Sequence, residues 1–276
     1  MVMPSIGIMQ GRLLPEFIGE LQVFPISNWN KELFYANVIG FNYFELLYDK
    51  KMCLHELMQK KENFQNLGLD PQNNSVKIKS TSVCLDYFAS ISLIADDTSL
   101  FFLDELHNTM KLFKNSNIEI LVIPFCEVNQ ISQPKTLRKA LKMLNSYGID
   151  KLAAEYELKI SLELDLPANI ITGEFSHYVF ENIGICFDLG NIKSVGLRPE
   201  SEILELNKLI NHIHIKDRSI AGPNVMLGDG DVDFTACFHS LINTGYSGRF
   251  IMETRYFIDP IKEASENLEY FRRAVT

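Results

Sequence analysis

The sequence is poor in cysteine, and its cysteines are not spaced for cross-linking or for binding zinc. There are five of them in 276 residues, widely separated and without a C-x-x-C pair. This excludes a disulfide framework and a zinc knuckle as the basis of the fold. We therefore expect a cytoplasmic protein with reduced, mostly buried thiols at Cys53, Cys84, Cys126, Cys186 and Cys237.

Long hydrophobic runs are also missing. Nowhere do about 20 apolar residues follow one another, which is the length needed to cross a bilayer. Residues 1–12 lack the basic start and the long apolar centre of a secretory signal peptide. We expect neither a membrane span nor export.

Positive charge is scarce relative to negative charge. The chain has 26 Lys and Arg against 35 Asp and Glu, a formal net charge of −9. A nucleic-acid-binding protein must neutralise many phosphates, so this balance argues against such a partner. No Pro-, Gly- or Ser-rich linker divides the chain, and we therefore expect residues 1–276 to form one domain.

Short β-branched and aromatic runs recur along the chain with segments of helical spacing between them. Several runs are apolar at both alternating positions, for example residues 118–123, which is typical of parallel strands covered on both faces. Eight strands are predicted, over residues 5–10, 43–47, 79–86, 119–124, 159–164, 183–188, 212–216 and 250–253.

Helices are predicted over residues 100–113, 137–158, 201–209, 234–243 and 260–274, and Gly148 interrupts the second of them. The irregular stretches 13–29 and 70–76 are expected to be loops, the first long enough to act as a lid. Strands and helices that alternate in this way predict an α/β fold, a single-domain (β/α)8 TIM barrel, with an open doubly wound sheet as the alternative.

The ends of the last four predicted strands carry residues that suit a metal. In a parallel barrel, alternate residues point inward and the C-terminal strand ends form the active-site mouth. The last inward residues are then Glu163, Asp188, His214 and Glu253. Three converging carboxylates repel one another unless a cation joins them. We therefore predict one divalent metal ion, manganese first, with zinc, magnesium or cobalt as alternatives.

Each of these residues also has a structural interpretation. Glu163 and Asp188 could pair with Lys216 and Arg255, and His214 could be a satisfied core histidine. The occurrence of all four residues at the ends of four consecutive strands favours the metal site over this interpretation.

Six motifs occur in an order that is found in one known superfamily. With them the chain resembles, over essentially its whole length, the xylose isomerase-like barrels, a superfamily of sugar isomerases and epimerases. The resemblance to sugar 3-epimerases implies the same four metal ligands. The motifs are Ile6-Gly-Ile-Met-Gln-Gly-Arg12, Ser161-Leu-Glu163, Phe187-Asp-Leu-Gly-Asn191, His212-Ile-His-Ile-Lys-Asp217, Leu227-Gly-Asp-Gly-Asp-Val-Asp-Phe234 and Phe250-Ile-Met-Glu-Thr254.

The resemblance also implies a reaction. A sugar or sugar phosphate would be isomerised or epimerised by proton abstraction next to its carbonyl, through a metal-stabilised enediolate. Glu163 and Glu253 would be the catalytic pair on opposite faces of the substrate, and the sequence leaves open which of them takes the proton. A dehydratase on the same barrel and a non-catalytic sugar-binding relative are the alternatives. Family members are commonly homodimers or homotetramers.

Polar residues at or just beyond strand ends are predicted to contact the substrate. Asn191 stands where many relatives carry a histidine. An asparagine can still form a hydrogen bond to the substrate at this position, but it cannot transfer a proton. Histidines are also missing around Glu45 and Cys84, which argues against the DNA-repair branch of the superfamily. Gly228 and Gly230 match no phosphate-loop pattern and indicate a turn at the mouth. The predicted substrate contacts are Arg12, Glu45, Asn191, Lys216, Arg218 and Arg255.

Overall fold

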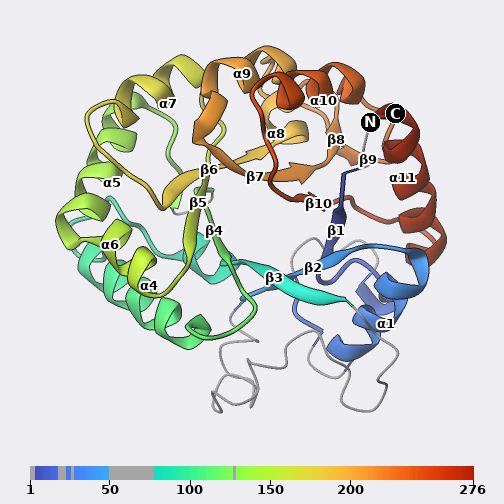
Figure 1. The fold of residues 1–276 in the computed structure, drawn as a ribbon, viewed down its shortest axis with the longest axis horizontal. Helices are drawn as coiled ribbons and strands as arrows, with labels where there is room; N and C mark the ends of the chain where they lie inside the picture. The colour runs from blue at the N-terminus through green and yellow to red at the C-terminus, as the bar shows by residue number, and fades with distance from the viewer. Residues whose placement is uncertain (1–3, 18–22, 26–27, 50–77, 127–128) are drawn as a thin grey trace.

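The computed structural model describes residues 4–17, 23–25, 28–49, 78–126 and 129–276, and they form a closed parallel barrel (Figure 1). Every neighbouring pair of barrel strands is parallel. The predicted TIM barrel is therefore confirmed, and the open sheet is excluded by closure between the first and last strands. Around the barrel the strands are β1 (Ile6–Met9), β10 (Phe250–Met252), β7 (Ile210–Ile215), β6 (Ile183–Asp188), β5 (Lys159–Glu163), β4 (Ile120–Pro124), β3 (Lys79–Cys84) and β2 (Tyr43–Leu47).

Helices surround the barrel on its outside (Figure 1). Three of them, α1, α7 and α8, were not predicted, because two are short and the first follows a long loop. The predicted helix 137–158 is wrong as a single element: Gly148 ends α5 in a left-handed conformation with φ of 84° and begins α6. The helices are α1 (Trp29–Ile39), α4 (Ser99–Phe113), α5 (Pro134–Tyr147), α6 (Ile149–Glu155), α7 (Ala168–Phe175), α8 (Leu189–Ser194), α9 (Pro199–Leu206), α10 (Phe234–Asn243) and α11 (Pro260–Ala274).

The hydrophobic core has an outer and an inner part. The outer part fills the layer between strands and helices, where side chains such as Phe102 and Leu141 are fully buried. The inner part lies inside the barrel and consists of small clusters around Ile251 and Val122. The remaining interior positions of β2, β5, β6 and β7 hold polar side chains, and these form the site described below.

The connecting segments are described in part. The predicted loop 13–29 contains a 3₁₀ turn at Pro15–Phe17, while residues 18–22 and 26–27 lie outside the described residues, as do the whole predicted loop 70–76 and Cys53. After β7 comes a short antiparallel pair, β8 (Asp217–Arg218) and β9 (Asn224–Val225). Within the described ranges, no helix combines the length and the apolar character that crossing a bilayer requires.

Candidate metal centre at the barrel mouth

Four strand ends bring the predicted ligands together. Asp188 and His214 are register partners on β6 and β7. Glu163 ends β5, and Glu253 directly follows β10, where its backbone amide still bonds to the carbonyl of Ile215. One donor atom from each of the four predicted ligands lies within 4.8 Å of the others. The convergence expected from strand alternation is therefore present.

The Nδ1 atom of His214 lies near the middle of this cluster. It is 3.1 Å from Oε2 of Glu253 and 3.9 Å from Oε2 of Glu163. The atom is buried, and among the described residues it has no hydrogen-bond partner of acceptable geometry. A buried nitrogen without a partner is costly, and a cation bound through its lone pair would satisfy it.

Two basic side chains offset part of the negative charge. The ammonium of Lys216 lies 2.8 Å from Oδ2 of Asp188 and 3.1 Å from Oε2 of Glu253. A guanidinium nitrogen of Arg12 lies 3.5 Å from Oε1 of Glu253. The structural pairing of Asp188 with Lys216, which was the competing interpretation, is thus also present.

The two glutamates are held in opposite states of ionisation. Burial, together with the charges of Glu253 and Asp188, raises the pKa of Glu163 to about 8. Burial acts in the same direction on Glu253, but Lys216 and His214 outweigh it and hold the pKa of Glu253 well below its usual range. Without a further cation, the cluster therefore favours the protonated form of Glu163 and the ionised form of Glu253.

The charge balance fits a divalent cation. Three of the proposed ligands are carboxylates, and Glu45, which contacts His214, adds a fourth. Lys216 and Arg12 supply two positive charges. When all carboxylates are ionised, 2 − 4 leaves two negative charges to be balanced. Three oxygen donors and one imidazole nitrogen are a donor set used by manganese, zinc and related ions.

A cavity of about 380 Å³ opens above the cluster. Both predicted catalytic glutamates line it, as do four of the predicted substrate contacts: Asn191, Lys216, Arg218 and Arg255. Its volume suits a small molecule.

Two of these lining residues also hold the cluster in place. Asn191 donates to Oε1 of Glu163 at 3.2 Å and accepts from Arg218 at 3.0 Å. Arg218 also donates to the backbone carbonyl of Gly222 on the β8–β9 turn. Lys216 contacts Asp188 and Glu253. These predicted substrate contacts therefore use part of their hydrogen-bonding capacity within the protein.

Two predicted substrate contacts do not line the cavity. Glu45 is fully buried beneath the mouth, and its two oxygens contact His212 and His214 at 2.7 and 2.8 Å. We therefore correct its expected position on the pocket wall: the residue lies inside the barrel. Arg12 is 3% exposed and lies beside Glu253.

The structure also places residues in or near the site that the sequence did not single out. Asp165 and Cys126 line the cavity. Asp165 comes two residues after Glu163, and this continuation of the inward alternation was the available signal. Asp217 accepts hydrogen bonds from the backbone amides of Gly228 and Gly230 and so anchors the glycine-containing loop as a turn.

A second hollow, of about 960 Å³, lies at the opposite end of the barrel, where β4, β5, β6 and β7 begin. It is larger than the cavity at the mouth. None of the predicted site residues lines it, so the chemistry of this chain is to be sought at the mouth.

Known proteins share both the sequence pattern and the fold. L-ribulose-5-phosphate 3-epimerase UlaE from Shigella flexneri serotype 5b is 21% identical over 241 residues, which cover 82% of this chain and 81% of the relative. The structure of L-ribulose 3-epimerase aligns with a TM-score of 0.73 at 13% identity, covering 99% of this chain and 95% of that one. The crystal structure of IOLI protein with a bound zinc atom aligns with a TM-score of 0.71 at 18% identity, covering 98% of each chain.

The family model described as xylose isomerase-like TIM barrel matches residues 34–274. This range holds seven of the eight barrel strands and all four predicted metal ligands. The chain belongs to the xylose isomerase-like TIM barrel family.

Proposed function

We propose that this protein is a metal-dependent epimerase or isomerase of a sugar or sugar phosphate. The observation that carries the proposal is the convergence of Glu163, Asp188, His214 and Glu253 at the floor of the mouth cavity. Relatives named as L-ribulose-5-phosphate 3-epimerase and L-ribulose 3-epimerase support this reaction class. The proposed ligands of one divalent ion are these same four side chains.

Glu163 and Glu253 are arranged to act on a bound substrate from different sides. Their strands, β5 and β10, are separated around the barrel by β6 and β7. Oε2 of each glutamate faces Nδ1 of His214, whereas Oε1 of Glu163 faces Asn191 and Oε1 of Glu253 faces Arg12. Each carboxylate therefore has one oxygen turned toward the proposed metal position and a second oxygen for another partner.

The chemistry needs a base on one face of the substrate and an acid on the other. A bound divalent ion would polarise the substrate carbonyl and a neighbouring hydroxyl. One glutamate removes the proton from the adjacent carbon, and the other returns a proton to the opposite face, which inverts that carbon. Asn191, Arg218 and Arg255 are placed to bind substrate hydroxyl or phosphate groups along the cavity wall.

The metal is tested by elemental analysis of protein purified without chelator or metal-affinity tag. We expect about one divalent ion per chain, and much less in His214→Ala, because this substitution removes the one nitrogen donor of the proposed ligand set. Manganese, zinc, magnesium and cobalt are measured together. Metal content that is unchanged in His214→Ala would remove His214 from the ligand set.

The reaction is tested by incubating ketoses and ketose phosphates with metal-loaded protein in deuterated water. We expect incorporation of deuterium next to the carbonyl, with a product that differs from the substrate in mass only by the exchanged hydrogen. Glu253→Gln should abolish this exchange and retain some metal. Glu174→Gln serves as the control, because Glu174 is equally buried but pairs with Arg138 away from the mouth. A product that has lost water would show a dehydratase instead.

A further inference from the structure

Glu45 makes an unusual contact across the inside of the barrel. It lies on β2, which is separated from β7 by β1 and β10 in the barrel order, yet its carboxylate reaches two histidines of β7. Oε1 is 2.8 Å from Nε2 of His214, and Oε2 is 2.7 Å from Nε2 of His212. All three side chains are fully buried. No solvent competes for these hydrogen bonds, so they fix both rings strongly.

The hydrogen-bond pattern decides which nitrogen of each ring carries the proton. In the part of the chain that the structure describes, Nδ1 of His212 and Nδ1 of His214 lack a hydrogen-bond partner. Nε2 of each ring has an oxygen of Glu45 within 2.8 Å. Oε2 of Glu253 lies 3.1 Å from Nδ1 of His214, but it is not in hydrogen-bond geometry and belongs to a proposed metal ligand. A buried N–H without an acceptor costs free energy. The protons therefore belong on the Nε2 atoms, which donate to Glu45.

This tautomer has a consequence for the metal centre. With the proton of His214 on Nε2, its Nδ1 carries the lone pair, and Nδ1 is the atom that faces Glu253 and Glu163. Histidines that bind metals usually donate their second nitrogen to a carboxylate or carbonyl, which fixes the ring and raises its basicity. Glu45 occupies the position of that carboxylate.

Building on the metal centre proposed above, we propose that Glu45 is a positioning residue, which locks His214 in the tautomer and orientation that present Nδ1 to the metal. His212 is the second anchor, because it occupies the other carboxylate oxygen and keeps the carboxylate from rotating. Glu45 does not line the cavity, so it acts on the site through His214 alone.

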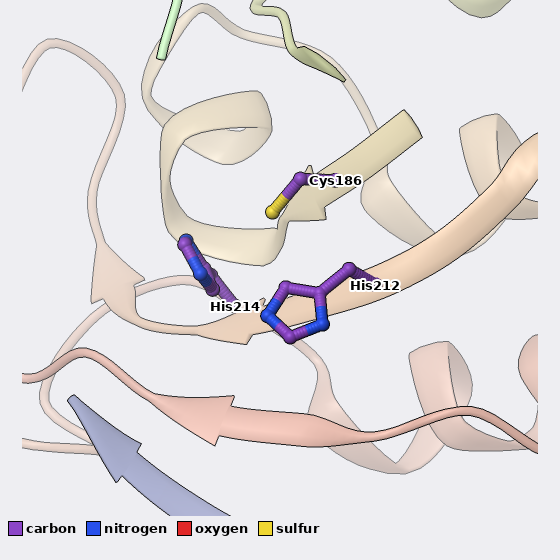
Figure 2. A group of neighbouring side chains, drawn as sticks. All are labelled: Cys186, His212 and His214. Carbon is purple, nitrogen blue, oxygen red and sulfur yellow. The ribbon is translucent and has the colours of Figure 1, made fainter. Parts of the chain in front are cut away.

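Another arrangement of the same residues is a metal site deeper in the barrel. Cys186, His212 and His214 project into the same interior space from β6 and β7 (Figure 2). Their donor atoms lie within 4.8 Å of one another. A metal bound there through Nε2 of either ring would have to displace Glu45 from that ring, which would take a partner from a buried carboxylate. The hydrogen bonds to Glu45 therefore favour the positioning role, and metal stoichiometry distinguishes the two arrangements.

The test compares Glu45→Ala and Glu45→Gln with the unsubstituted protein and with Glu174→Gln, which changes another buried glutamate away from the mouth. Zinc affinity is measured by competition with a chromophoric chelator. Glu45→Ala should weaken zinc binding about 10- to 100-fold. Glu45→Gln should retain most of the affinity, because its amide oxygen can still accept from His214. Glu174→Gln should bind zinc as the unsubstituted protein does.

Nitrogen-15 spectra of histidine-labelled, zinc-loaded protein provide a readout that a loss of stability alone would not change. In the unsubstituted protein, His212 and His214 should both carry their proton on Nε2. In Glu45→Gln, the amide NH₂ has to donate to one ring, so His212 should move its proton to Nδ1 while His214 keeps the original tautomer. His212→Gln and His214→Gln assign the two signals.

The outcomes separate the inference from the function on which it rests. If the unsubstituted protein binds no zinc or manganese, the metal centre itself is wrong, and the inference falls with it. If it binds one zinc and Glu45→Ala binds zinc equally well, only the positioning role is wrong. Two zinc ions per chain, one of them lost in Cys186→Ala, would show that a metal binds at Cys186, His212 and His214, and the positioning role of Glu45 would be wrong.

Discussion

The ammonium nitrogen of Lys216 lies 2.8 Å from Oδ2 of Asp188, and the two side chains are only 8% and 1% exposed. The same nitrogen also contacts Glu253. Lys216 is thus part of the charge balance of the proposed metal centre as well as a residue of the cavity wall. Removing one partner from a buried ion pair leaves the other charge without compensation.

Lys216→Met should therefore destabilise the metal-free protein. We expect the free energy of unfolding to fall by about 3–5 kcal/mol near neutral pH, measured by urea unfolding in the presence of a chelator. Lys139→Met is the control, since Lys139 pairs with Asp96 at the surface, where both side chains are exposed, and its loss should leave the free energy of unfolding nearly unchanged. Equal unfolding midpoints for the two variants would contradict the structural role of Lys216.

Glu32 makes the stability depend on pH. Its carboxylate is fully buried and accepts from the backbone amides of Gly11 and Leu13 at 3.0 and 2.9 Å. Burial raises the pKa of Glu32 from 4.5 to about 7, against the opposing effect of these amides. Between these two values the folded protein holds a proton that the unfolded chain has lost, so stability is highest at the acidic end of this window and falls as the pH rises.

Glu32→Gln removes this titration. The free energy of unfolding of the unsubstituted protein should fall by about 3 kcal/mol, relative to that of the variant, as the pH rises from 4.5 through 7. Urea unfolding of both proteins across this range measures the difference. Parallel curves would show that Glu32 ionises normally.

The fold could be predicted almost completely from the sequence, because short β-branched and aromatic runs alternate with segments of helical spacing along the chain. All eight predicted strands are present within a few residues of their predicted ends. The helices were harder to predict. The short α7 and α8 contain too few turns for a periodic pattern, and a single glycine, Gly148, was enough to divide one predicted helix into α5 and α6.

The site was predictable as far as it depends on strand ends. The alternation of side chains selected Glu163, Asp188, His214 and Glu253, which do converge. The contacts across the barrel were not predictable, because they depend on register. The pairing of β2 with β3 is irregular between Phe44 and Glu45, and the predicted position of Glu45 on the pocket wall was wrong.

Gly230 is required by close packing against Asp217. A Cβ atom at position 230 would lie 2.2 Å from Oδ1 of Asp217, the buried carboxylate that anchors the turn. Gly230→Ala should therefore destabilise the protein by about 1–3 kcal/mol, which thermal unfolding measures.

The control is Gly173→Ala in α7. There a Cβ atom would meet nothing within 4 Å, and the added helix propensity should stabilise the protein by about 0.5–1 kcal/mol. The two alanine variants should thus shift the melting temperature in opposite directions. A shift of the same sign in both would show that the turn adapts to the added methyl group.

Cys126 offers a way to probe the mouth cavity chemically. It is exposed and lines the cavity. Cys84 also lines the cavity but is buried, as are Cys186 and Cys237. Burial also raises the pKa of each of these three thiols, so the reactive thiolate form is rare at neutral pH. Among these four cysteines, a maleimide reagent should therefore modify Cys126 first, which peptide mapping by mass spectrometry will show.

A bulky adduct at Cys126 should also fill part of the cavity. If the mouth binds the substrate, modification should abolish the deuterium exchange of the metal-loaded protein and leave its metal content unchanged, because Cys126 is not among the proposed ligands. Cys126→Ser should be active and should keep its activity after the same treatment. Full exchange activity in protein that is completely modified at Cys126 would mean that the substrate binds elsewhere.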